Sequence, residues 1–143
     1  MYLPNLRRRN SAMDSKALKR FCHCLIVLEG GNFQKAKNDE IYRLGMLCLF
    51  QLTVELACMA IRSALEQSRV RGTETKTNKE ILRLAASTGL LYNEAVWMRM
   101  LKAKNPVTQV YTNEEANEMM SQLRSRFIPA FRELRETLGR FVK

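Results

Sequence analysis

Apolar residues in this chain recur every three or four positions, and no stretch of useful length alternates between apolar and polar residues. Spacings of three and four place side chains on one face of an α-helix, whereas a half-buried strand needs strict alternation. The sequence also contains only 6 Gly and 3 Pro among 143 residues, which is few turns for an all-β or α/β chain. The pattern therefore predicts an all-α fold built from long helices.

Capping residues divide this pattern into segments. Asp14 or Ser15 would cap a first helix that ends at Gly30. Asn38-Asp39 would cap a long second helix that reaches about Gln67, and its middle is apolar nearly all the way round, which predicts burial on several sides. The apolar stripe expected on the first helix consists of Leu18, Phe21, Cys22, Leu25 and Leu28.

Two capping boxes mark the starts of later helices. Thr77-x-x-Glu80 opens a short third helix, and Thr112-x-x-Glu115 opens the long last helix. Asn93 would cap another short helix between them. These segments predict an antiparallel up-and-down bundle of three long and two short helices, or a four-helix bundle if the short pair is counted as one broken helix.

The last helix has the longest apolar stripe, and Pro129 predicts a kink within it, because proline cannot donate a backbone hydrogen bond. The residues of this stripe are Ala116, Met120, Leu123, Phe127, Phe131, Leu134, Leu138 and Phe141.

Residues 1–13 are polar and basic, so we expect a flexible lead-in there and a single helical domain over residues 14–143. Met13 is an alternative natural start. The formal net charge is +10, and it is still +7 by count without the block Arg7–Arg9. This balance favours acidic partners such as nucleic acid, a nucleotide or an acidic protein face, although scattered basic residues also fit a generally basic, solvated surface.

The cysteines form no C-x-x-C pair, and Cys22-His23-Cys24 is the only metal-like string. Residues two apart on a helix point in widely different directions, so these sulfurs would not grip one ion. We expect buried free thiols, a reducing cytoplasm and no metal site. The four residues concerned are Cys22, Cys24, Cys48 and Cys58.

A long apolar run over residues 44–61 has Gln51 and Glu55 in its middle. A carboxylate at a bilayer centre is costly, so the run predicts a buried bundle helix of a soluble protein that has no contact with a membrane. Glu55 shares a helix face with Gln51 and is a candidate ligand-binding residue. A buried carboxylate needs a partner, which Arg99 or Lys102 could provide; the alternative is a structural ion pair within the bundle.

The break before the last helix, at residues 101–111, brings cations, amides and a phenol to the place where two helix ends meet. A helix N-terminus with a nearby lysine is a ready-made anion site. The alternative is an ordinary turn between helices, in which Asn105 caps and Pro106 begins a helical turn. The candidate ligand-binding residues in this break are Lys104, Asn105, Gln109 and Tyr111.

Motifs of common enzymes are absent: the sequence has no Gly-rich phosphate loop, Walker lysine, H-E-x-x-H or G-x-S-x-G. His23 is the only histidine and has no acidic neighbour at a helical spacing, so it fits a surface or interface position better than a catalytic base. No catalytic residue is assigned on this basis.

Several short strings occur in an order that resembles one family. The string F-x-x-T-x-E-L-A at residues 50–57 is followed by Thr-Gly-Leu-Leu at 88–91, W-x-x-M-L at 97–101 and K-N-x-x-x-Q-x-Y at 104–111. In this order and spacing they resemble the nucleotidyltransferase substrate-binding proteins, a branch of the HEPN helical domains, over residues 14–141.

The resemblance implies an antiparallel helical bundle that forms a homodimer. It also implies a separate minimal nucleotidyltransferase as partner, the pair often behaving as a toxin–antitoxin-like module. In the active HEPN branch, an R-x4-6-H motif cleaves RNA at the dimer interface. Here Lys104 stands in place of the arginine and loses its planar fork. Gln109 stands in place of the histidine, and an amide cannot act as general acid or base.

The resemblance and these departures together favour a non-catalytic subunit that binds a nucleotide or the partner's substrate and has no cofactor of its own. Nucleotidyl transfer would belong to the other chain. Two alternatives stay open from the sequence: a divergent HEPN ribonuclease that acts on RNA, and a pure protein-interaction dimer.

Overall fold

The computed structural model describes residues 4–103 and 112–140, with side chains from residue 16 onward. Every regular element within these ranges is helical, which confirms the predicted all-α fold. In chain order the elements are α1 (Pro4–Glu29), α2 (Phe33–Asn38), α3 (Glu40–Gln67), a 3-10 turn (Thr73–Thr75), α4 (Asn78–Ser87), α5 (Glu94–Ala103), α6 (Asn113–Gln122), a π-helical turn (Leu123–Phe127) and α7 (Ile128–Gly139).

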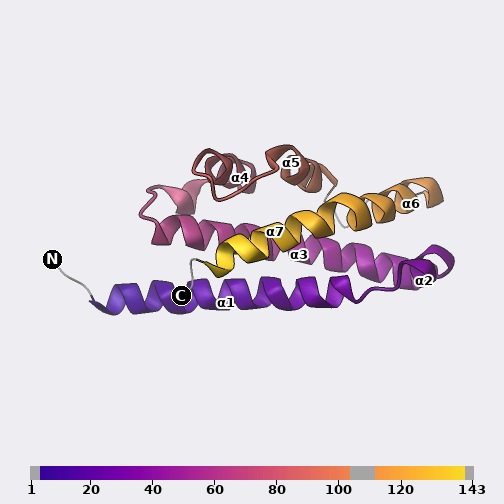
Figure 1. Cartoon of the computed structure of the whole chain (residues 1–143), viewed down its shortest axis with the longest axis horizontal. Coiled ribbons are helices and arrows are strands. Elements are labelled where there is room, and N and C mark those ends of the chain that lie inside the picture. Colours follow the sequence, from indigo (N-terminus) through magenta and orange to yellow (C-terminus); the bar gives the residue numbers. More distant parts are fainter. Residues whose placement is uncertain (1–3, 104–111, 141–143) are drawn as a thin grey trace.

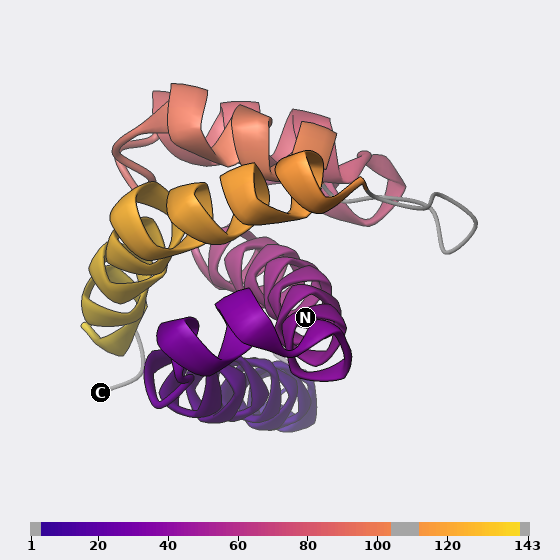
Figure 2. The same ribbon diagram turned by 90° about the vertical axis from the view of Figure 1, so that its right-hand side faces the viewer.

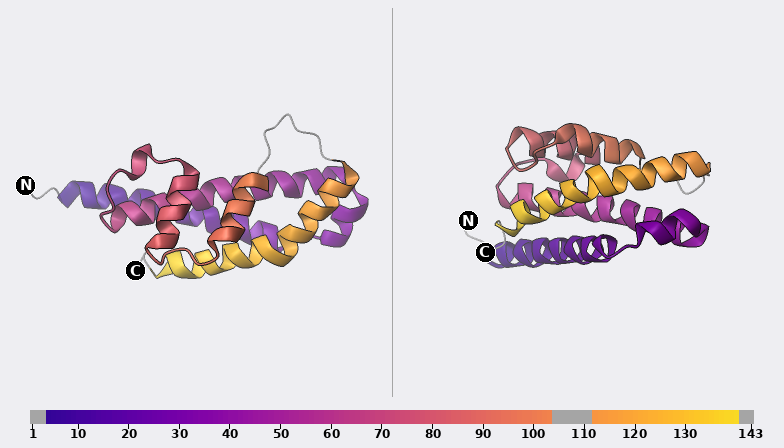
Figure 3. Two further views of the ribbon diagram at one scale, coloured as in Figure 1. Left: turned by 90° about the horizontal axis from the view of Figure 1, so that it is seen from above. Right: turned by 45° about the vertical axis from the view of Figure 1, so that its right-hand side comes forward.

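Three long rods form the bundle, as Figure 1 shows. α1 and α3 lie antiparallel and pack along their length, and α6, the π-helical turn and α7 form one continuous rod antiparallel to α1. The short helices α4 and α5 lie on the side of α3 that faces away from α1 (Figures 1 and 2). Figure 3 shows them crossing the long axis of the bundle. The three long and two short helices predicted from the sequence are therefore all present, with α2 in addition.

The helix starts follow from local capping. The Asp39 carboxylate accepts a hydrogen bond from the Tyr42 N–H at 3.1 Å and caps α3, as predicted. The Thr77 hydroxyl accepts from the Glu80 N–H at 3.2 Å and caps α4. Each bond satisfies one backbone donor that the first helical turn leaves without an intrahelical partner.

The first part of the chain differs from the sequence-based expectation. α1 begins at Pro4, ahead of the predicted cap at Asp14 or Ser15, so the helix reaches into the predicted lead-in. The short helix α2 was not predicted. Asn32 caps it by accepting from the Lys35 N–H at 2.9 Å, and this Asn was the available signal, but a six-residue helix is too short to show an apolar period.

The irregularity expected at Pro129 lies just before it, as a π-helical turn. Pro129 has no N–H for the carbonyl of Ser125, four residues earlier, so the regular α-helical ladder cannot continue through this point. The chain widens by one residue instead, and the Ile128 N–H bonds to the Leu123 carbonyl, five residues earlier.

Five aromatic rings meet in the core, one each from α1, α3, α5, the π-helical turn and α7. Phe50 stacks on Phe127 with 5.2 Å between ring centroids. Phe131 contacts Trp97 at 5.6 Å and Phe21 at 6.0 Å, both edge-on. None of the five side chains is more than 2% exposed. The stripes predicted for the first and last helices therefore point into one shared core.

α3 is the one helix in the described part of the chain that is long and apolar enough to cross a membrane by length and composition, with a mean hydropathy of 1.9 in its most apolar window. In the bundle, 56% of that window is buried against other helices. A core helix passes the same length and composition test, so its packing accounts for the apolar run.

The free thiols differ in exposure. Cys24 and Cys58 are buried, as predicted, and burial raises the pKa of Cys58 to about 12. Cys22 is half-buried and Cys48 is exposed, which corrects the expectation for those two thiols. Cys48 escapes burial because it lies on the outward face of α3. His23 is exposed on α1, which agrees with the surface position expected for it.

A polar contact joins the end of α1 to α7. The carboxylate of Glu29 accepts from Arg135 Nη1 at 2.7 Å and from Arg132 Nε at 2.6 Å. The hydrogen bond from Arg135 is the main reason that the pKa of Glu29 lies below its ordinary value of 4.5, and Arg132 adds to this. The ionised carboxylate is therefore favoured in the folded state.

The Glu29→Gln variant is expected to lose about 1 kcal/mol of unfolding free energy near neutral pH, because a partly exposed charge-assisted contact is worth that order. The lowered pKa means that the stabilisation is present above pH 4.5 and is lost as the pH falls through the folded-state pKa. Urea unfolding of both proteins across this range measures the difference. A difference that persists unchanged in acid contradicts the assignment.

Candidate functional site

Four of the candidate residues, Lys104, Asn105, Gln109 and Tyr111, lie outside the described residues. The two ends of their segment are described: α5 ends at Ala103, and Thr112 caps α6. The segment therefore joins the C-terminal end of α5 to the N-terminal end of α6, as the sequence predicted.

The N-terminus of α6 is capped by side chains of the chain itself, Thr112 and Glu115. The Glu115 N–H donates to the Thr112 hydroxyl at 3.1 Å, and the Thr112 N–H donates to the Glu115 carboxylate at 3.3 Å, which confirms the predicted capping box. Glu114 adds a second carboxylate to the first turn. An anion at this helix end would meet two negative charges, so any anion held near this break would have to rely on cationic side chains.

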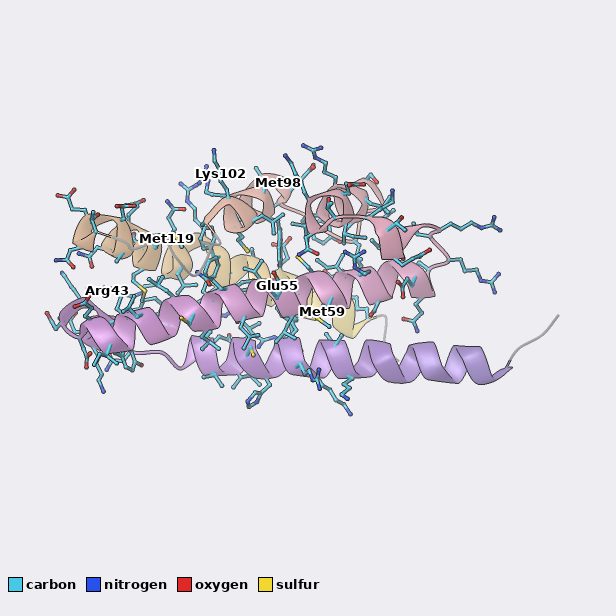
Figure 4. The ribbon with its side chains drawn as sticks, turned by 180° about the vertical axis from the view of Figure 1, so that it is seen from behind. Arg43, Glu55, Met59, Met98, Lys102 and Met119 are labelled. Carbon is cyan, nitrogen blue, oxygen red and sulfur yellow. The ribbon has the colours of Figure 1, made fainter. Side chains whose placement is uncertain are left out.

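Glu55 lies near the middle of α3, and Figure 4 shows it on the part of α3 that faces α5. Its side chain is half-buried, which is less than the buried carboxylate expected from the sequence. Arg99 and Lys102, the expected partners, have exposed side chains on α5. Figure 4 places Met98 and Lys102 together on α5 and Met59 one turn beyond Glu55 on α3. Glu55 thus sits on a partly open surface between α3 and α5.

The outward face of α3 carries an exposed apolar stripe, which we call the α3 stripe. Its members recur at spacings of three, four, four and seven, so they fall within a sector of about 80° around the helix. Glu55 lies in the same sector. Four of the seven large exposed apolar side chains in the described part of the chain belong to this stripe. The α3 stripe consists of Ile41 (85% exposed), Leu44 (45%), Cys48, Leu52 (50%) and Met59 (49%).

Sequence reasoning missed the α3 stripe because α3 is apolar on every side. The contact that α3 makes with α1, α4, α6 and α7 is known only once the helices are packed. The side left uncovered then emerges as the one that carries Ile41, Cys48 and Leu52. Exposed apolar patches of this kind mark contact surfaces more often than isolated apolar residues do.

His23 does not join Glu55. It is exposed on α1, and α1 and α5 lie on opposite sides of α3 (Figures 1 and 2). Within one chain, the only histidine is therefore separated from the α3–α5 face by the body of the bundle.

Arg43 is a buried cation that the sequence analysis did not single out. It is 7% exposed, at the N-terminal end of α3. Its guanidinium donates to the carbonyls of Ala36 at 3.1 Å and Lys37 at 3.3 Å, and to the Asn113 side chain at 3.4 Å. These bonds fasten the end of α2 to the start of α6. The available signal in the sequence was an arginine one turn inside an apolar helix. Its partner Asn113 is 70 positions away, so the contact could not be predicted from the sequence.

Comparison with known proteins identifies a family for the chain. The chain matches the family model described as nucleotidyltransferase substrate binding protein like, over residues 15–140. A search of curated proteins finds no match.

Proposed function

The chain belongs to the nucleotidyltransferase substrate-binding protein-like family. We propose that it is a non-catalytic subunit that binds a nucleotide or a substrate on behalf of a separate nucleotidyltransferase. The observation that carries the proposal is the family match over residues 15–140, which spans the core and both flanks of the break between α5 and α6. In this proposal the partner chain performs the transfer. This chain holds a nucleotide or the partner's substrate, and the two together form a toxin–antitoxin-like module.

The residue types at the break support a binding role. Gln109 stands where the ribonuclease branch has its histidine, and an amide has no proton to exchange near neutral pH. His23 belongs to α1, and α1 lies on the opposite side of α3 from α5 within the same chain. Lys104 still offers a positive charge to a phosphate. The break can therefore bind an anion even though it lacks the histidine that would transfer a proton.

The net charge supports the choice of ligand. At +10, the chain attracts nucleotides and other phosphorylated molecules and repels other cations. Glu55, half-buried in the same sector of α3 as the α3 stripe and on the part that faces α5, would orient a bound hydroxyl or amine, since a carboxylate accepts hydrogen bonds.

The proposal includes a homodimer that forms through the α3 stripe. Two chains that each carry +10 repel one another, so they approach best where exposed charge is lowest. From Leu44 to Val54, α3 contains no charged residue, and its exposed positions are apolar or small. Gly45, with open space around it, and Cys48 leave room for two α3 helices to come close. A two-fold contact uses the same patch on both copies, which suits a single self-complementary stripe.

The proposal predicts that the tagged full-length chain, purified from its native lysate, brings a small nucleotidyltransferase with it. Incubating RNA with the pure chain distinguishes the binding-subunit proposal from the ribonuclease alternative. We expect no cleavage of the RNA. RNA cleavage that His23→Ala abolishes and Gln109→Ala leaves intact would favour the enzyme instead. The interaction-dimer alternative is favoured if ATP and GTP give no heat of binding with or without the partner.

A further inference from the structure

A cavity of about 440 Å³ opens at the end of the bundle where α2 meets α6 and the π-helical turn. Figures 1 and 3 show α2 and α6 at this same end. Ligand sites for small molecules commonly fall between about 300 and 1,000 Å³, so the space admits a molecule of nucleotide size. Its chemistry comes mainly from six side chains, which are Phe33, Lys37, Asn117, Ser121, Arg124 and Ser125.

The lining is cationic on both sides. Lys37 projects from α2 and Arg124 from the π-helical turn, and no carboxylate is among the lining residues of the described chain. The Arg124 guanidinium lies over the Phe33 ring, 5.5 Å from its centroid. Neither cation takes part in an ion pair found among the described residues. Two positive charges therefore face one space without a negative charge between them, which favours an anion there.

Two acidic residues close in sequence to lining residues, Asp39 and Glu118, are already engaged. Asp39 caps α3 through the Tyr42 N–H, and Glu118 accepts from the Gln122 side chain at 3.0 Å. Each carboxylate is bonded to a partner within the first turns of its own helix or along it, and neither forms an ion pair with Lys37 or Arg124 among the described residues.

The buried Arg43 fixes the geometry of the cavity. Its bonds to the Ala36 and Lys37 carbonyls and to Asn113 hold the C-terminal end of α2 against α6. The side chain of Lys37 thus leaves a backbone that is anchored to the opposite wall. Because π-helical turns occur often at functional sites, the turn that carries Arg124 adds to the case for a binding role.

We propose that this cavity binds a mononucleotide, with the phosphate between Lys37 and Arg124 and the base against the Phe33–Arg124 pair. Asn117 and the Ser121 hydroxyl supply hydrogen bonds to the sugar and base edges, and the Ser125 hydroxyl, which donates to the Ser121 carbonyl at 2.8 Å, can accept one. Arginine and aromatic rings both stack on bases, and a lysine–arginine pair suits a phosphate. The inference goes beyond the proposed function, because it names a ligand class and a site apart from the break between α5 and α6. It places the ligand about 18 Å along α3 from Glu55, because Glu55 lies twelve positions after Arg43.

Isothermal titration of the full chain with AMP tests the site, with inorganic phosphate and adenosine as separate probes. The double variant Lys37→Gln/Arg124→Gln is expected to weaken AMP binding by about tenfold or more. The matched control Lys79→Gln/Arg83→Gln removes the same charge from exposed positions on α4 and is expected to change it less than about twofold. Phe33→Leu is expected to weaken AMP and adenosine while leaving phosphate unchanged. Circular dichroism melting checks that each variant is folded.

Equal weakening by the two double variants would overturn the site, since it would show attraction by overall charge alone. Absence of AMP binding to the unmodified chain would overturn it as well. Neither result touches the proposed partnership, because co-purification of a nucleotidyltransferase is measured independently. Loss of that partnership with retained, Lys37-dependent AMP binding would overturn the proposed function and leave the cavity as a nucleotide site.

Discussion

The Phe131→Ala variant is expected to lose about 3–5 kcal/mol of unfolding free energy, which is the usual cost of removing a buried phenyl ring. Phe131 has no solvent exposure and touches rings from three other helices, which are Phe21, Phe50 and Trp97. The structure cannot close the resulting gap without moving several helices. Since domains of this kind are stable by about 5–15 kcal/mol, the variant should unfold at much lower urea or temperature.

Urea unfolding followed by circular dichroism measures this loss. The control is Arg126→Ala, on the same rod but exposed, for which a change within about 0.5 kcal/mol is expected. A loss below about 1 kcal/mol for Phe131→Ala would mean that the ring cluster is not the centre of the core.

The Leu52→Glu variant is expected to convert the dimer proposed to form through the α3 stripe into monomers. Leu52 is 50% exposed in the single chain and lies in the middle of the α3 stripe. Near a two-fold axis, the substitution brings two carboxylates together and removes them from water. We expect a cost of about 3 kcal/mol, or roughly a hundredfold in the dimer Kd.

Light scattering after size exclusion gives the mass of each species. The matched control is Tyr92→Glu, which places the same charge on a 55% exposed apolar residue outside α3 and should leave the dimer intact. Thiol labelling of Cys48 is a second readout: Cys48 is exposed in the single chain and the proposed dimer would cover it, so Leu52→Glu should label faster. A dimer that survives Leu52→Glu and dissociates with Tyr92→Glu would move the interface off α3.

Much of the fold could be predicted because it depends on local signals. The stripe from Ala116 to Leu138 is buried at every predicted position within the described residues, and the caps at Asp39, Thr77 and Thr112 start the helices that they were expected to start. Helical period and capping act within one or two turns, so a sequence carries them directly.

Other features depend on how the helices meet, and the sequence does not carry them locally. Cys48 sits in an apolar helix and was expected to be buried, but packing leaves its side of α3 uncovered. The cavity between Lys37 and Arg124 joins residues far apart in the chain, and the bonds of Arg43 that fix it span up to 70 positions. Period and composition do not reveal such contacts.

The candidate site also combines features that the sequence carries locally with features that depend on packing. Glu55 could be identified from its place in an apolar run. Its position facing α5 depends on how the helices pack. The residues at 104–111 were identified by resemblance, and their positions lie outside the described residues. The family match over residues 15–140 supports the resemblance as a whole and leaves each residue's role to experiment.

The most direct test of the binding-subunit proposal is the mass-spectrometric composition of the complex recovered with the tagged chain from its native lysate. The account predicts a small nucleotidyltransferase in near-equal amount to this chain, retained through a second, size-exclusion step. Recovery of this chain alone, or of this chain with RNA and no nucleotidyltransferase, would contradict the account and point to a stand-alone dimer or a nucleic-acid binder.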